Sequence, residues 1–190
     1  MLALGALAFA APARAIWLSE SIGVAKLAGP FDAGDEKIFA AFLEKPRPTP
    51  LRVLWLDSRG GVLEAGVKIA ALVRKARLTT AVRADAATCD SACTLVFIAG
   101  ARRHYVNGQT VPEGLSAWTG LGFHGVSLRG DAARPTIKYE GGEQLLAKHY
   151  RELGVPGAAD LVARAAINTV WRPSGATALR LRIATSLSEP

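Results

Sequence analysis

The chain alternates between strand-like apolar runs and amphipathic helical stretches. Residues 51–57 (LRVLWLD) are nearly all apolar, with β-branched and aromatic side chains, which is typical of a strand buried on both faces of a parallel sheet. Apolar residues recur at helical spacing through 62–76, and a strand pattern returns at 78–84. The stretch 51–84 therefore predicts a right-handed βαβ unit.

The alternation continues on both sides of this unit. An opening strand is expected within 21–29, and a helix capped by Asp35 is expected to run to Leu43. Downstream the pattern predicts a helix from Ser91 to Gly100, strands at 103–106 and 123–128 with a long loop at 107–122 between them, helices at 141–153 and 157–167, and a last helix and strand within 172–185. This order indicates an α/β fold, and 190 residues suit a single domain.

The amino-acid composition excludes some classes of protein. Half of the residues are hydrophobic and 21% are charged, which excludes long disorder. The net charge of +7 is spread from Lys26 to Arg182 and is not clustered in a stripe with aromatic residues. We interpret it as a solubility feature or as weak attraction to acidic surfaces, and we expect no nucleic-acid partner.

The N-terminal stretch has features of a signal peptide. Residues 1–15 are mainly apolar and end in Ala-Arg-Ala, which fits the small-x-small rule for cleavage before Ile16, although a positive n-region is missing. The stretch is shorter than the ~20 residues that a membrane span needs, so we expect no stable span. The prediction is an exported, periplasmic or secreted domain of residues 16–190; the alternatives are a frayed apolar helix or a first strand.

A serine lies at the start of a predicted helix, directly after a predicted strand. Residues 88–97 read TCDSACTLVF, and Ser91 is this serine. The helix dipole and the Ala92 N–H would both favour negative charge beside its oxygen. Asp90 is expected to cap the helix and leave the Ser91 hydroxyl free as a nucleophile; the alternative is an ordinary helix-capping serine.

Two cysteines flank this serine, and they are the only ones in the chain. Zinc would need two further ligands, which neither another cysteine nor a close histidine pair supplies, so we expect no metal site. We interpret Cys89 and Cys93 as small buried apolar side chains. A disulfide is the second interpretation, because helical positions four apart match its preferred geometry poorly. An oxidising compartment would allow it to persist.

Paired glycines and one histidine complete the candidate chemistry. Gly60 and Gly61 directly follow the strand of 51–57, and their N–H groups would form either an anion cradle or an ordinary tight turn. Neither a GxGxxG nor a Walker A pattern surrounds them, so we expect no nucleotide cofactor. Of the three histidines, His124 lies between glycines where it is best placed to act as a base for Ser91.

These motifs together resemble those of the Clp protease proteolytic subunits and the crotonase superfamily, most closely the exported Clp-like proteins of bacteria. The matching pieces are, in order, LWLDSRGG, a helix, LTTAV, CDSACTLVFIAGARR and FHG, within residues 24–185. The resemblance implies a spiral of βαβ units with a small perpendicular sheet. It also implies a nucleophile at Ser91, a base at His124 and an oxyanion hole from the N–H groups of Gly61 and Ala92.

Three features depart from that family's pattern. Arg59 stands where a proline is usual, and the loop 107–122 is longer than usual. The family's triad acid would fall near Asn168, where this chain has no carboxylate. Asn168 would orient His124 as a neutral amide, with Asp160 as the alternative acid. Loss of an orienting aspartate costs several orders of magnitude in rate.

The favoured hypothesis is a serine hydrolase, an ATP-independent peptidase with no cofactor that acts on short or flexible peptide or protein substrates. The resemblance also implies a homo-oligomer, ring-shaped or trimeric. The alternative is a catalytically impaired binding or scaffold protein, which the missing acid favours. Acyl-CoA chemistry of the crotonase type shares the fold, but it does not need the Ser91–His124 pair, and an exported protein would not meet coenzyme A.

Overall fold

The main sheet is largely parallel. The computed structural model describes residues 16–115, 119–128, 137–138, 141–165 and 169–190. The strands of the main sheet are, in spatial order, β1 (Trp17–Ser21), β2 (Val24–Ala28), β3 (Val53–Asp57), β4 (Thr79–Arg83) and β6 (Arg103–Val106). β1 runs antiparallel to β2, and every later neighbour runs parallel. The parallel pairing of β3 with β4 confirms the predicted βαβ unit.

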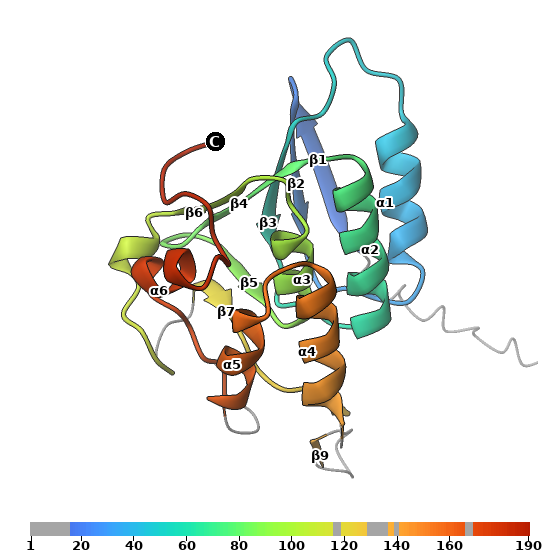
Figure 1. The fold of residues 1–190 in the computed structure, drawn as a ribbon. Coiled ribbons are helices and arrows are strands. Elements are labelled where there is room, and N and C mark those ends of the chain that lie inside the picture. The colour runs from blue at the N-terminus through green and yellow to red at the C-terminus, as the bar shows by residue number, and fades with distance from the viewer. Residues whose placement is uncertain (1–15, 116–118, 129–136, 139–140, 166–168) are drawn as a thin grey trace, which may run out of the picture.

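Three helices lie along one side of this sheet (Figure 1): α1 (Asp35–Glu44), α2 (Leu63–Lys75) and α3 (Ala92–Ile98). Leu54 and Leu56 of β3 are fully buried, whereas Trp55 between them is half-buried. β3 was expected to be buried on both faces, and this is wrong for one of them. On that face the Arg83 guanidinium lies 5.2 Å from the Trp55 ring centroid.

A second, smaller sheet positions the candidate chemistry. It consists of β5 (Thr88–Asp90) and β7 (Gly120–Gly122), which run parallel. Ser58, just after β3, joins the two sheets, because its N–H donates to the Thr88 carbonyl and its carbonyl accepts from the Asp90 N–H. The other described elements are the 3-10 helix η1 (Gly108–Thr110), β8 (Ser127–Leu128), β9 (Ile137–Lys138), α4 (Gly142–Glu152), α5 (Gly157–Ala163) and α6 (Gly175–Arg180).

Several predicted element boundaries are wrong. The strand expected at 123–128 is not continuous: β7 lies before it, inside the predicted loop, and within 123–128 only Phe123, as a single bridge to Trp171, and β8 are paired. Gly34, in a left-handed conformation, caps α1 in place of Asp35. The buried Asp35 carboxylate instead accepts hydrogen bonds from the N–H groups of Asp32 and Ile16. β1 was not predicted.

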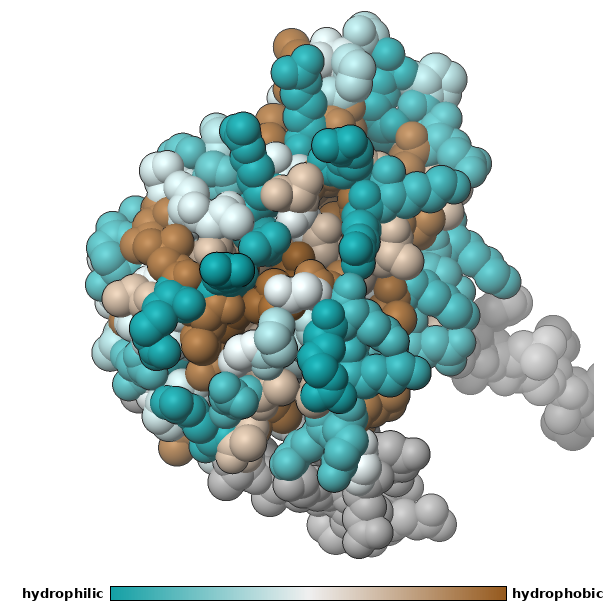
Figure 2. Space-filling model, in the orientation of Figure 1, coloured by the Kyte–Doolittle hydropathy of each residue, from teal (hydrophilic) through white to brown (hydrophobic). Residues whose placement is uncertain are grey.

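In the described ranges, no helix has both the length and the apolar character to cross a bilayer. The face in Figure 2 gathers hydrophobic residues near its centre, with hydrophilic residues around them. A hollow of about 160 Å³ lies between α2, α3 and α4, lined mainly by Val67, Ala70, Leu95 and Leu153. Its lining does not include Ser91.

Candidate active site

Ser91 occupies a strained turn between β5 and α3. Its φ and ψ angles are 55° and −126°, a region that costs a serine about 1–3 kcal/mol and is found mainly at functional sites. The Ser91 N–H donates to the Gly122 carbonyl at 2.9 Å, and Thr94 donates to the Ser91 carbonyl through both its N–H and its hydroxyl. The Ser91 side chain makes no capping hydrogen bond, so the helix-capping alternative is wrong. A strained strand–turn–helix serine is the arrangement that exposes a nucleophile.

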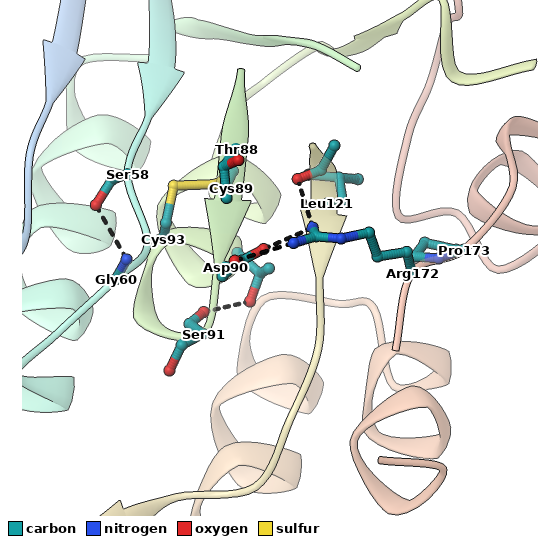
Figure 3. Close-up of polar contacts among 12 residues, drawn as sticks. Ser58, Gly60, Thr88, Cys89, Asp90, Ser91, Cys93, Leu121, Arg172 and Pro173 are labelled. Carbon is teal, nitrogen blue, oxygen red and sulfur yellow. Dashed lines mark hydrogen bonds and ion pairs between the residues drawn. A yellow bond between two sulfur atoms is a disulfide. The ribbon is translucent and has the colours of Figure 1, made fainter. Parts of the chain in front are cut away.

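A disulfide spans this turn (Figure 3). Cys89 and Cys93 are fully buried and bonded, with their Cα atoms 5.2 Å apart. The interpretation as two free buried thiols is therefore wrong, and the second interpretation, a disulfide, holds. The argument from helical spacing does not apply, because Cys89 lies in the strand β5 and only Cys93 lies in α3.

Asp90 does not cap α3 as expected. Its carboxylate is buried and pairs with Arg172, whose Nη1 and Nη2 donate to Oδ1 and Oδ2 at 2.7 and 3.1 Å. Eighty-two residues separate the two partners, so local sequence patterns gave no sign of the pair. Although Asp90 does not cap the helix, the Ser91 hydroxyl has no hydrogen-bond partner among the described residues.

The paired glycines lie against the start of α3. A Cβ on Gly60, whose φ is 76°, would lie 2.5 Å from the Asp90 carbonyl oxygen and 2.9 Å from the Ala92 nitrogen. The Phe31 N–H donates to the Gly60 carbonyl, and the Val62 N–H donates to the Phe31 carbonyl. Phe31 therefore forms a parallel bridge with Gly61 through the residues on either side of it, and this bridge does not use the Gly61 N–H.

Two N–H donors remain open at this turn. Within the described ranges, nothing accepts a hydrogen bond from the N–H of Gly61 or of Ala92. Ala92 begins α3, so its N–H is one of the helix donors that have no acceptor within the helix. Donors of this kind stabilise an oxyanion that forms on a carbonyl attacked by the adjacent serine.

His124 lies two residues after β7, and the neighbour of β7 in the small sheet is β5, which ends just before Ser91. The register pairs Asp90 with Gly122, so both chain segments leave the small sheet at the same edge. His124 Nδ1 lies 2.7 Å from the Gly125 carbonyl oxygen. Because a carbonyl only accepts, Nδ1 carries the proton and Nε2 of the neutral ring is left as an acceptor. No hydrogen bond joins His124 to the Ser91 hydroxyl among the described contacts.

The position expected for the triad acid lies partly outside the described residues. Asn168 falls outside them. Phe123 and Trp171 form an antiparallel bridge with N–H···O distances of 2.8 Å in both directions, so the chain before Trp171 passes the segment that carries His124. Asp160 is exposed on α5, and no described hydrogen bond joins it to His124.

Other polar side chains near the turn have structural partners. The Tyr150 and Thr94 hydroxyls lie 2.8 Å apart, and burial raises the pKa of Tyr150. Burial also raises the pKa of Tyr105 to about 12, so this phenol stays neutral at ordinary pH. In the part of the chain that is described, no group of three or more histidine, cysteine or carboxylate side chains has the arrangement of a metal site.

Comparison with known proteins supports the fold. The sequence matches no family model and no curated protein. A serine-to-alanine mutant of a membrane-bound stomatin-specific protease is similar with a TM-score of 0.66 and 13% identity, over 88% of this chain and 79% of that chain. A Streptomyces avermitilis protein assigned as an enoyl-CoA hydratase is similar with a TM-score of 0.50 and 14% identity, over 93% and 68%. The chain thus has a single-domain α/β fold of the Clp protease and crotonase type.

Proposed function

We propose that this protein is a serine hydrolase that acts as a peptidase. The observation that carries the proposal is the strained turn at Ser91, with a free hydroxyl and the open N–H groups of Gly61 and Ala92 beside it. The fold's likeness to a stomatin-specific protease supports a peptidase more than it supports other hydrolases, because that protein cleaves a polypeptide.

The reaction would proceed through an acyl-enzyme. The Ser91 oxygen attacks the scissile carbonyl carbon while His124 Nε2 takes the hydroxyl proton. The N–H groups of Gly61 and Ala92 hold the oxyanion, and His124 then donates its proton to the leaving amine. Water, deprotonated by His124, then attacks the acyl carbon; the bond to the Ser91 oxygen breaks, His124 returns the proton to that oxygen, and the acid product leaves.

The hydrogen bond from His124 Nδ1 to the Gly125 carbonyl would keep the productive tautomer during this cycle. A carbonyl supplies orientation but no full negative charge, so the imidazolium that forms is stabilised less than beside an aspartate. We therefore expect a slow peptidase, active without ATP on short or flexible substrates.

The proposal extends to location and assembly. A signal peptide at residues 1–15 would export the domain to the periplasm or beyond, and the buried disulfide supports an oxidising compartment. Assembly into a homo-oligomer rests on the motif resemblance.

A binding or scaffold protein is the second candidate. It is favoured by the absence, within the described residues, of any carboxylate hydrogen-bonded to His124. Enoyl-CoA hydration has only the shared fold in its favour.

A fluorophosphonate probe separates the candidates, because it labels a serine only when that serine is activated. We expect labelling of the purified protein, none in Ser91→Ala, and at least about a hundredfold slower labelling in His124→Ala. His149→Ala, which changes a histidine outside the site, should label normally. Absence of labelling in the unmodified protein, or labelling that persists in Ser91→Ala, would refute the hydrolase proposal and favour the scaffold.

A further inference from the structure

A buried ion pair lies directly behind the serine turn, and the proposed mechanism does not use it. Arg172 is 3% exposed and Asp90 is 6% exposed. Besides its two bonds to the carboxylate, Arg172 donates from Nη1 to the Gly120 carbonyl at 3.1 Å. A guanidinium bonded to both oxygens of a carboxylate fixes orientation as well as distance, so this contact holds one geometry.

The pair joins three chain segments that carry the candidate site. Asp90 ends β5 next to Ser91, Gly120 begins β7, and Arg172 follows Trp171 in the C-terminal segment. Figure 3 shows the Arg172 side chain extending across β7 to reach Asp90. The backbone of that C-terminal segment is itself bridged, through Trp171, to Phe123, which directly follows β7. The ion pair therefore ties the serine turn to the strand that leads to the candidate base.

The backbone of β7 is packed tightly against this carboxylate. A Cβ on Gly122 would lie 2.0 Å from Asp90 Oδ1 and 2.5 Å from Val170 Cγ1, so the carboxylate and the Val170 side chain together fill the space that a side chain would need. The Gly122 carbonyl is also the acceptor of the Ser91 N–H. A shift of the Asp90 carboxylate would thus move the backbone group that holds Ser91 in place.

Stability alone does not explain the pair. The cost of removing two charges from water offsets most of their attraction, and apolar residues of similar size often give equal or greater stability. A backbone conformation as strained as that of Ser91 persists only where surrounding contacts over-determine it. A rigid, bidentate contact at the preceding residue is such a constraint.

We propose that Arg172 is a positioning residue for Ser91: it holds Asp90 against β7 and so keeps the serine turn and His124 in reactive alignment. This inference rests on the proposed hydrolase function. Arg172 acts through Asp90 and does not itself meet the substrate.

Two variants test the inference through saturation kinetics of fluorophosphonate labelling, which separate the limiting rate from the half-saturating concentration. Arg172→Lys keeps the positive charge but cannot donate to both carboxylate oxygens in the paired geometry of a guanidinium. Gly122→Ala displaces the Asp90 carboxylate while both charges remain. For each we expect the limiting rate to fall about 10- to 100-fold, as for a small misplacement of a reacting group. The half-saturating concentration should change less than about twofold, because the probe's binding surface is kept.

Phe39→Ala is the matched control, because it removes a fully buried side chain from α1, which carries none of the site residues. It should lower the melting temperature and keep the normal limiting rate in the folded protein. If Arg172→Lys does not fold, the limiting labelling rate of Gly122→Ala alone tests the inference. Normal rates in a folded Gly122→Ala protein overturn the inference, and so does an equal loss of rate in Phe39→Ala. No labelling of the unmodified protein refutes the proposed function instead.

Discussion

Ser91 combines an unfavourable backbone conformation with a side chain that makes no hydrogen bond within the described part of the chain. Its N–H and carbonyl are both hydrogen-bonded, to Gly122 and Thr94, so the polypeptide around the hydroxyl is fixed. A residue with a merely structural role would more often use the hydroxyl as a cap, since that satisfies a helix donor. In this protein the two backbone hydrogen bonds maintain the strained conformation of Ser91, and the hydroxyl remains available as a nucleophile.

Gly60→Ala should abolish most of the reactivity of Ser91. The added methyl group would lie 2.5 Å from the Asp90 carbonyl oxygen, and the residue would also keep a φ of 76°. We expect fluorophosphonate labelling to slow about a hundredfold, because the turn must shift. Gly34→Ala is the matched control, since its φ is 95° but no atom lies within 4 Å of the added carbon. Equal effects of the two substitutions would contradict this role of Gly60.

At the scale of elements, the serine turn is the junction of β5 and α3, and the disulfide joins these two elements across it. The bond closes a short loop, with a sequence separation of four. It therefore restricts the unfolded chain only modestly, while it fixes how the strand enters the helix.

Removal of the disulfide should lower stability by a limited amount. For Cys89→Ala/Cys93→Ala we expect the free energy of unfolding to fall by about 2 kcal/mol, the value for so short a loop. Urea unfolding of this variant and of the oxidised and reduced unmodified protein measures the change. Identical unfolding midpoints for the oxidised and reduced protein would contradict the prediction.

At the scale of the whole molecule, the main sheet and its three helices contain much of the hydrophobic core, and the small sheet carries the candidate site at the start of α3. The strands β3 and β4 and the helix α2 contribute fully buried side chains, among them Ile69. Cys89, Ala92 and Cys93 at the serine turn belong to the same core, but Ile69 lies on α2 and not on the turn. We therefore expect stability and reactivity to be separable at Ile69.

Ile69→Ala should cost about 2–5 kcal/mol of unfolding free energy, since it leaves a cavity in the core. Ile38→Ala, at an isoleucine of α1 that is 44% exposed, should cost less than about 1 kcal/mol. Chemical denaturation of both variants measures the difference. A loss of serine labelling in the folded Ile69→Ala protein would contradict the separation of stability and reactivity at Ile69.

The sequence alone predicted those structural elements that depend on the local pattern of apolar and polar residues. Long periodic stretches predicted the βαβ unit, and a serine placed between a strand and a helix predicted the turn at Ser91. Contacts between distant residues carried no such signal, which is why the Asp90–Arg172 pair was not foreseen. The disulfide ranked second only because Cys89 was treated as helical. β7 is three residues long and bounded by glycines, too short for a period to be recognised.

Because of its contact with Ile16, Asp35 should make the stability of the folded protein depend on where the N-terminal segment is cleaved. Its buried carboxylate accepts the Ile16 N–H, so cleavage before Ile16 would replace that amide with a charged α-ammonium group. Charge-assisted hydrogen bonds are roughly twice as strong as neutral ones. A chain that starts at Ile16 should then melt at a higher temperature than its N-acetylated form, and Asp35→Asn should remove the difference. Equal melting temperatures would contradict this. If the difference is found, cleavage before Ile16 would itself strengthen the contact between the residue that precedes β1 and the first turn of α1.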